Sequence, residues 1–357
     1  MRIVQLNPYY YPFMGGIEHR IHHMSKRLAR SHDVTVVTSR LEGTKEEERM
    51  DGYRVLRLKS KFFGDYNPPY VSSEGVLEAL RGLRPDIVDF HYRWAPSYTR
   101  QVMRYDGKVV FTYHNTFGEG QGAMRVMSYL NDWSFMRKMR SFERVVCISE
   151  FVKNDNARHG FPMERMTVVP NGVEMPADSP QDLGFILSLG RIVHTKGLEY
   201  LIEAMRGLDA KLIIAGGGPE KEKLEALSRH HGLEGKVEML GRVSEERKNE
   251  LFATCSFFVM PSLFESYGIA AAEAMSYGKA VVATNVGGLP EVVADCGVLV
   301  PPRDPMALAK AIASLLEDEG RRIDLGRKAR ARASKYSWDR VAELQEQVYL
   351  EVVGKNK

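Results

Sequence analysis

Short apolar runs rich in β-branched residues alternate along the whole chain with longer amphipathic segments. In the first half, we predict strands at 2–6, 34–38, 55–58, 87–90, 109–113, 145–148 and 167–169. In the second half, we predict strands at 185–189, 211–215, 237–240, 257–260, 280–284 and 298–300. Because the runs are continuously apolar, they predict parallel sheets that are covered on both faces, as in α/β folds.

Segments with the 3.6-residue period of an amphipathic helix fill many of the gaps between these runs. We predict helices at 17–30, 72–83, 197–207, 220–231, 245–254 and 269–277. The last segment, 337–353, places Trp338, Val341, Leu344 and Val348 on one stripe, so we predict a helix that packs back toward the first half. Strand and helix alternate in both halves, which predicts two doubly wound domains.

The length of 357 residues also favours two domains, since a single core rarely grows beyond about 250–300 residues. The stretch 171–184 contains Pro176, Pro180 and few apolar residues, which is typical of a linker. We therefore predict domains at 1–174 and 175–336, with the returning helix at 337–357.

The composition is that of an ordinary soluble protein, with 44% hydrophobic and 27% charged residues. A net charge of +4 suits an anionic ligand or membrane face, but it is too small to indicate a nucleic acid partner, and no nucleic-acid-binding motif is present. The three cysteines are odd in number and far apart, so neither a disulfide framework nor a zinc site is indicated.

The start of the sequence, MRIVQLNPYYYPF, lacks the long apolar run of a signal peptide. No apolar stretch reaches the roughly 18 residues that a membrane-spanning helix needs. We therefore expect a cytoplasmic protein that is at most peripheral, at the inner face of the membrane.

Three loops that follow predicted strands carry candidate chemistry, because ligands of open α/β sheets bind outside the carboxyl ends of the strands. The first contains Gly15 and Gly16 just before a helix, where exposed N–H groups could meet a phosphate. The alternative is a simple tight turn. Neither this loop nor 216–219 has the G-x-G-x-x-G spacing, which argues against a nicotinamide dinucleotide.

The second loop, 190–197, carries Arg191 and Lys196 after a strand. Two cations above one strand end could neutralise a diphosphate, the arginine as a fork and the lysine as a point charge. The alternative is a solvated basic loop.

The third loop precedes a helix, with Glu265 before it and Glu273 about two turns inside it. A carboxylate can accept hydrogen bonds from vicinal sugar hydroxyls. Helices also carry exposed glutamates without any function, but the neighbours of Glu273 are alanines and a methionine. A charge in so apolar a helix needs a partner.

Together these motifs resemble the family 4 glycosyltransferases of the GT-B superfamily, which retain anomeric configuration. The resemblance spans nearly the whole chain, through 11–18, 170–173, 190–197, 215–219, 265–273 and 287–291. It implies an α/β fold with two Rossmann-like domains facing each other across a cleft, the first for the acceptor and the second for the nucleotide sugar. The N-terminal half is most similar to the catalytic subunit that adds N-acetylglucosamine to phosphatidylinositol and to the phosphatidylinositol mannosyltransferases.

The resemblance also implies roles for individual residues. His114 would contact the donor sugar, although a structural histidine is the alternative, and His91 could face the acceptor or be structural. The implied catalytic residues are Arg191, Lys196, Glu265 and His114; the diphosphate would be held by Gly15, Gly16, Arg191 and Lys196; the donor sugar by Glu265, Tyr267, Gly268, Ile269 and His114; the ribose by Glu273; the base by Leu240, Gly241, Arg242 and Val243; and the acceptor by Tyr9, His91, Asn115 and Arg125.

The predicted reaction needs no cofactor or metal ion. No Asp-x-Asp occurs in the sequence, so the usual carboxylate anchor for a metal on a nucleotide diphosphate is missing. The resemblance favours a UDP-sugar as donor, with GDP-mannose next, and a lipid-linked or small polyol or sugar acceptor. It also suggests same-face attack, with the donor phosphate accepting the proton of the acceptor.

The segment 124–144 mixes aromatic and methionine side chains with five basic residues. Such a helix can dock at an anionic membrane surface, although an ordinary domain helix has the same composition. The competing functions are a catalytically silent subunit that binds a sugar nucleotide, and an epimerase or phosphorylase on the same fold. The presence of Arg191, Lys196, Glu265 and Glu273 together argues against a silent subunit.

Overall fold

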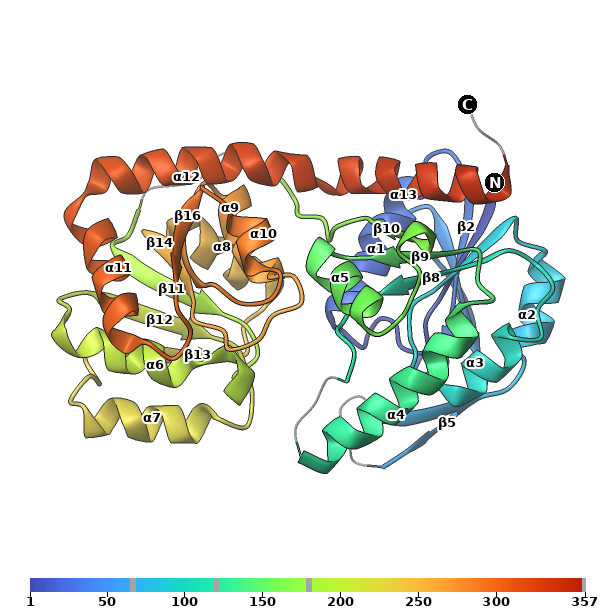
Figure 1. The fold of residues 1–357 in the computed structure, drawn as a ribbon, viewed down its shortest axis with the longest axis horizontal. Coiled ribbons are helices and arrows are strands. Elements are labelled where there is room, and N and C mark those ends of the chain that lie inside the picture. Colours follow the sequence, from blue (N-terminus) through green and yellow to red (C-terminus); the bar gives the residue numbers. More distant parts are fainter. Residues whose placement is uncertain (65–68, 119–121, 178–181, 355–357) are drawn as a thin grey trace. The chain divides into compact units, whose positions relative to one another are not determined.

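The computed structural model describes residues 1–64, 69–118, 122–177 and 182–354, and it divides the chain into two compact units (Figure 1). The N-terminal unit comprises Met1–Gly172 and Trp338–Lys357, and the C-terminal unit comprises Val173–Ser337. The chain therefore passes into the second unit within the predicted linker and returns at the last helix. Pro180 of that linker lies outside the described residues.

The N-terminal unit is built on an eight-stranded sheet in which only β3 runs antiparallel to its neighbour among the described strands. Its central strands are the apolar runs expected from the sequence, and each pairs with the next in parallel register. In spatial order the strands are β10 (Met166–Val168), β9 (Arg144–Cys147), β8 (Val109–Tyr113), β7 (Ile87–Phe90), β1 (Arg2–Leu6), β2 (Asp33–Ser39), β4 (Tyr53–Leu58) and β3 (Glu47–Met50).

Helices and one hairpin complete this unit. The hairpin corrects the sequence prediction, because the first residues of the helix expected at 72–83 form a strand that pairs with residues 60–63. Gly75, with φ 82°, then makes the turn into the helix. The elements are α1 (Gly16–Leu28), β5 (Ser60–Phe63), β6 (Tyr70–Ser73), α2 (Val76–Leu83), α3 (Pro96–Val102), α4 (Gly122–Met139), α5 (Glu150–Arg158), a 3-10 turn (Met163–Arg165) and α13 (Trp338–Val353).

The C-terminal unit is built on a six-stranded sheet whose described pairs are all parallel. In spatial order its strands are β13 (Val237–Gly241), β12 (Lys211–Ala215), β11 (Phe185–Leu189), β14 (Phe257–Met260), β15 (Ala280–Thr284) and β16 (Gly297–Val300). Its α-helices are α6 (Leu198–Ala204), α7 (Lys221–His230), α8 (Glu245–Thr254), α9 (Ile269–Ser276), α10 (Leu289–Val293), α11 (Pro305–Glu317) and α12 (Glu319–Ala333), with 3-10 turns at His194–Lys196, Met205–Gly207 and Ser334–Tyr336.

Each unit has its own hydrophobic core. In the C-terminal unit, the inner residues of β11, β12, β14 and β15 pack against α6 and α11. In the N-terminal unit, α1 and α13 pack together over the sheet, and Trp338, Val341 and Tyr349 of α13 are buried. The final helix is therefore a structural part of the N-terminal unit, although it is the last element of the chain.

Candidate functional site

In the C-terminal unit, two predicted loops meet at the carboxyl ends of the neighbouring strands β11 and β14. A small pocket there is lined by Arg191 and Lys196 from the first loop and by Pro261 and Ser262 from the second. The hydroxyl oxygen of Ser262 is buried and has no hydrogen-bond partner in the described part of the chain. The fold thus brings the two cations and an unsatisfied polar group to one pocket, as a diphosphate site requires.

The two cations are in different states. The ammonium of Lys196 contacts the carboxylate of Glu265, and both side chains are largely buried. Arg191 is exposed and makes no hydrogen bond or ion pair with any residue in the described ranges. Lys196 and Glu265 therefore neutralise each other, while the guanidinium of Arg191 is free to bind an incoming anion.

Glu273 of α9 has a protein partner that the sequence did not indicate. Lys248 of α8 places its ammonium 2.7 Å from Oε1 of Glu273 and 2.8 Å from Oε2 of Glu245. The two carboxylates raise the pKa of Lys248, against the opposing effect of its burial. The charge of Glu273 is thus compensated inside its apolar helix.

The loop between Glu265 and α9 is shaped by close backbone packing. Gly268 has φ 104° and is the N-cap of α9, and Tyr267 before it is buried. Gly287 approaches so closely that a Cβ there would lie 1.8 Å from the carbonyl oxygen of Glu265. The Gly-Gly motif at 287–288 therefore supports the loop that carries Glu265, Tyr267, Gly268 and Ile269.

The segment predicted to frame the base forms the end of the edge strand β13. The carbonyl oxygen of Gly241 accepts a hydrogen bond of 2.7 Å from the N–H of Gly216. The side chain of Arg242 packs over Gly217, where a Cβ would lie 2.8 Å from Cγ. Leu240, Gly241, Arg242 and Val243 therefore lie beside the glycine turn at 216–218, near the end of β12.

In the N-terminal unit, α1 begins at Gly16 with Gly15 as its N-cap. The Glu18 carboxylate folds back over this end of the helix, where it accepts hydrogen bonds from the backbone of Gly15 and, at 3.0 Å, from the Asn7 amide. Burial raises the pKa of Glu18 to about 7. A carboxylate thus already occupies the position predicted for a phosphate.

His114 and His91 follow the neighbouring strands β8 and β7, and their rings are in contact. Nε2 of His114 lies 3.1 Å from Nδ1 of His91, and both side chains are buried. Burial lowers the pKa of His91 to about 4, and it lowers that of His114 well below the ordinary value. Both rings are therefore neutral at physiological pH.

The residues assigned to the acceptor do not form one cluster. His91 hydrogen-bonds through both ring nitrogens, to His114 and Gln5, so the expectation that it faces an acceptor is wrong. Tyr9 is buried and donates its hydroxyl to the Pro69 carbonyl, so this group too is engaged by the protein. Asn115 is half-buried, and Arg125 is exposed on α4.

Two families match consecutive parts of the chain. The family described as Glycosyltransferase Family 4 matches residues 14–175, and the family described as Glycosyl transferases group 1 matches residues 176–332. The chain belongs to glycosyltransferase family 4. It is therefore an enzyme of nucleotide-sugar-dependent glycosyl transfer, as the motifs predicted.

Individual relatives of this glycosyltransferase agree. An uncharacterised glycosyltransferase of Methanocaldococcus jannaschii is 27% identical, over 96% of each chain. A phosphatidylinositol N-acetylglucosaminyltransferase of Arabidopsis thaliana is also 27% identical, over 87% of this chain and 73% of its own. Anabaena HepE, solved in complex with UDP-glucose, superimposes with a TM-score of 0.78 at 19% identity, over 98% of this chain and 100% of its own. The predicted GT-B fold, with two Rossmann-like units, is confirmed.

Several polar residues of this glycosyltransferase were missed from the sequence. Lys248 and Ser262 contact or line the nucleotide-side residues, and Glu18 covers the glycine loop. Arg93 holds Asp132 of α4 through a hydrogen bond of 2.5 Å in the core of the N-terminal unit. The only sequence signal for these residues is their place just after a strand or near a motif.

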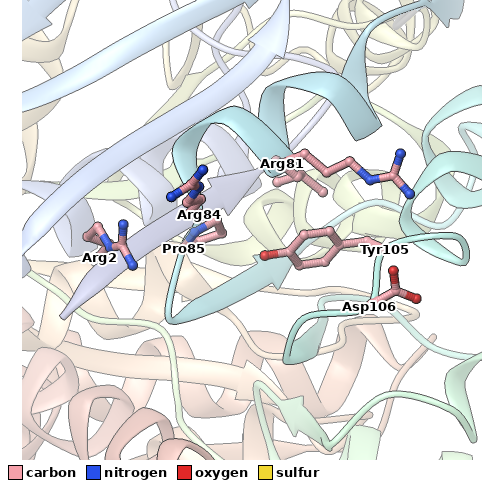
Figure 2. A pocket seen from close by; sticks show the side chains of 7 residues that line it. Arg2, Arg81, Arg84, Pro85, Tyr105 and Asp106 are labelled. Atoms are coloured by element: carbon pink, nitrogen blue, oxygen red, sulfur yellow. The ribbon is translucent and has the colours of Figure 1, made fainter.

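Figure 2 shows a cavity of about 390 Å³ in the glycosyltransferase that contains none of the predicted site residues. It lies at the amino ends of β1 and β7, the opposite edge of the sheet from His91 and His114. Arg2, Arg81 and Arg84 line it together with Tyr105 and Asp106. Its position at the amino ends sets it apart from the site that the motifs define.

In the described ranges, no three or more His, Cys, Asp or Glu side chains are grouped so that they could hold a metal ion. Nor does any helix of the described chain combine the length and apolar character needed to cross a membrane.

Proposed function

We propose that this glycosyltransferase moves a hexose or N-acetylhexosamine from a UDP-sugar to a lipid-linked or small polyol or sugar acceptor, with retention of configuration. The observation that carries the proposal is the pocket where Arg191 and Lys196 converge beside Glu265. A diphosphate in this pocket would bind the guanidinium of Arg191 and attract Lys196 away from Glu265. The freed Glu265 carboxylate could then accept hydrogen bonds from the donor sugar.

The C-terminal unit alone would hold the nucleotide. Glu273, oriented by Lys248, would accept hydrogen bonds from the ribose hydroxyls, and the backbone of 240–243 would frame the base. The unsatisfied Ser262 hydroxyl supports a phosphate oxygen as its partner. The role of the N-terminal unit would be to bind the acceptor and to present the ring of His114.

The chemical step breaks the bond between the anomeric carbon and the β-phosphate oxygen. Charge developing on the leaving diphosphate would be stabilised by Arg191 and Lys196. A retaining enzyme with a carboxylate nucleophile needs two carboxylates about 5–5.5 Å apart, and Glu265 is instead paired with Lys196. We therefore propose same-face attack, in which the acceptor oxygen bonds to the anomeric carbon and its proton passes to the leaving phosphate oxygen.

We also propose that the reaction needs no metal ion or other cofactor. The two cations at the pocket supply the positive charge that a divalent metal would otherwise contribute. The donor base rests on relatives: Anabaena HepE was solved with UDP-glucose, and the Arabidopsis relative is named for N-acetylglucosaminyl transfer. These names support UDP, with GDP-mannose as the alternative.

The name of the Arabidopsis relative also supports a phosphoinositide-like lipid acceptor, and α4 offers a surface for it. Its inward face includes Phe135, Met136 and Met139, so these three side chains of the predicted membrane segment belong to the core. On its outward side, Val126, Leu130 and Trp133 are at least half exposed at helical spacing.

Charge on α4 favours an anionic lipid surface as the occupant of this outward side. Arg137 lies over the Trp133 ring at 3.6 Å, and the exposed charges of α4 are the basic residues Arg125, Arg137 and Lys138. Basic and aromatic side chains together are typical of helices that lie at a membrane surface. We therefore propose peripheral membrane contact through α4, which would bring a lipid acceptor to the N-terminal unit.

A thermal-shift screen with EDTA present tests the donor site. UDP, GDP, ADP and their common sugar conjugates would each be added, and a ligand at 100 times its Kd should raise the unfolding free energy by about 2.7 kcal/mol. A shift with one nucleotide diphosphate would support the site and identify the base. No shift with any of them would contradict the proposal.

Turnover of the binding conjugate then separates the remaining alternatives. Release of the nucleotide diphosphate supports transfer, with water as the default acceptor. Conversion to an epimer without release would indicate an epimerase, and binding with neither change would indicate a silent subunit.

A further inference from the structure

A continuous chain of hydrogen bonds joins His114 to the C-terminal helix α13 within the N-terminal unit. His114 contacts His91, whose Nε2 lies 2.6 Å from Oε1 of Gln5. The amide nitrogen of Gln5 donates to the Tyr349 hydroxyl at 2.9 Å, and this hydroxyl donates to Oδ2 of Asp89 at 2.5 Å. All five side chains are buried.

The direction of every bond in this relay follows from Tyr349. Its hydroxyl has one hydrogen, and the carboxylate of Asp89 can only accept, so the hydrogen is donated there. Gln5 must then turn its NH₂ group toward Tyr349 and its carbonyl oxygen toward His91. The result is that Nε2 of His91 carries a hydrogen.

The same logic fixes the tautomer of His114. A neutral imidazole has one N–H, so His91 with a hydrogen on Nε2 offers a lone pair at Nδ1. That lone pair accepts from Nε2 of His114. The Nδ1 atom of His114 is left as an acceptor, and no residue in the described ranges hydrogen-bonds to it.

Asp89 is held in place independently of the histidines. Thr112 donates to Oδ1 at 2.7 Å, and Gln345 of α13 donates to Oδ2 at 3.4 Å. Gln345 in turn accepts from Arg20, whose guanidinium also binds Pro170 and Asn171. The acceptor at the end of the relay is thus rigid, which is needed for a buried network to select one tautomer.

We propose that α13 is part of the transfer machinery, with Tyr349 as a positioning residue. Through Gln5 and His91 it holds His114 as the Nε2–H tautomer, with Nδ1 at the carboxyl end of β8 as a hydrogen-bond acceptor. His114 then recognises a hydroxyl of the donor sugar or acceptor, and it does not donate to a phosphate. This inference rests on the proposed function for the role of His114, but the relay itself does not.

The test is Tyr349→Phe, which removes the one hydrogen that orients Gln5. Protein labelled with ¹⁵N-histidine reports the tautomer of each ring, and His114→Gln assigns the His114 signals. Tyr98→Phe is the matched control, since Tyr98 is also fully buried and hydrogen-bonds through its hydroxyl, at 2.7 Å to Ser39. Release of UDP from UDP-N-acetylglucosamine in water gives the activity.

Wild-type protein should show His114 with a hydrogen on Nε2 only. Tyr349→Phe should give a mixture of tautomers and about tenfold slower UDP release at an unchanged KM, as expected for the loss of one net hydrogen bond. Tyr98→Phe should change neither. An unaltered tautomer in Tyr349→Phe overturns the relay, and an altered tautomer with unaltered turnover overturns its role in transfer. If wild-type protein released no UDP from any donor, the proposed function would fail while the tautomer still decided the relay.

Discussion

The ammonium of Lys248 lies 2.7 Å from Oε1 of Glu273, so the carboxylate proposed for the ribose is held by a lysine from another helix. The contact leaves Oε2 of Glu273 for a ligand and fixes the side chain in one orientation. Pre-orienting a carboxylate in this way reduces the ordering that nucleotide binding must impose.

Lys248→Met should therefore weaken UDP binding. The loss of one charge-assisted hydrogen bond corresponds to roughly 1.5–3 kcal/mol, or about ten- to hundredfold in Kd. Titration calorimetry measures this, and Lys211→Met is the control, because Lys211 pairs with Glu238 at 2.7 Å on the exposed surface of the same unit. Tighter UDP binding in Lys248→Met would show that the lysine competes with the ribose.

Arg191→Ala should cut turnover by about 100-fold, because preorganised charge at the leaving diphosphate is lost. The fold should be unaffected, since Arg191 is exposed and unpaired within the described residues. Steady-state kinetics and the melting temperature check both statements. Arg206→Ala, at an exposed arginine of the same unit, should leave turnover unchanged. Near-wild-type turnover of Arg191→Ala would remove this residue from the mechanism.

Glu18→Gln should change how stability depends on pH. The folded pKa of Glu18 is about 7 against an ordinary 4.5, so the folded protein binds more protons than the unfolded chain between these values. Stability from this group therefore falls as pH rises from 4.5 to 7, and the penalty, at most roughly 3 kcal/mol, is complete above pH 7.

Denaturant unfolding of Glu18→Gln should accordingly show a gain over wild type at pH 8 that shrinks toward pH 5. Glu42→Gln, at an exposed carboxylate, should show no such dependence. A gain of equal size at both pH values would contradict the burial of a charged Glu18.

Replacing Leu130 and Trp133 by serine should reduce membrane binding through α4. Each side chain would bury apolar surface at the lipid interface worth about 1.5–3 kcal/mol, so the double variant should lose at least tenfold in partitioning. Flotation with phosphatidylcholine vesicles containing phosphatidylserine measures this. Met306→Ser is the control, as Met306 is 84% exposed on α11. Wild-type protein that stays in the lower fraction would exclude α4 as a membrane surface.

The central strands could be predicted from the sequence because their apolar runs satisfy both faces of a parallel sheet. The loop residues Arg191, Lys196 and Glu265 could be predicted for a related reason, since each follows such a strand. The hairpin of β5 and β6 could not, because residues 70–73 become a strand only by pairing with residues 60–63. Local periodicity favoured a helix there, and a tertiary contact overrode it.

Helices α11 and α12 were missed for a different reason. Their signals are present, as the side chains of Asp304 and Asp318 cap their first turns. The partners of the site residues, by contrast, left no local signal. Lys248 reaches Glu273 from another helix, and Gln5 meets Tyr349 across 344 residues of sequence.

The burial of α13 in the N-terminal unit has a consequence for the order of folding during synthesis. Residues 1–172 leave the ribosome first, but Gln5, Asp89 and the core around α1 lack Tyr349 and Trp338 until the end of the chain has been made. The C-terminal unit, 173–337, is continuous and fully synthesised before that point. The unit that starts first thus finishes last, and its incomplete core is exposed to chaperones and proteases for the whole time that the second unit takes to emerge.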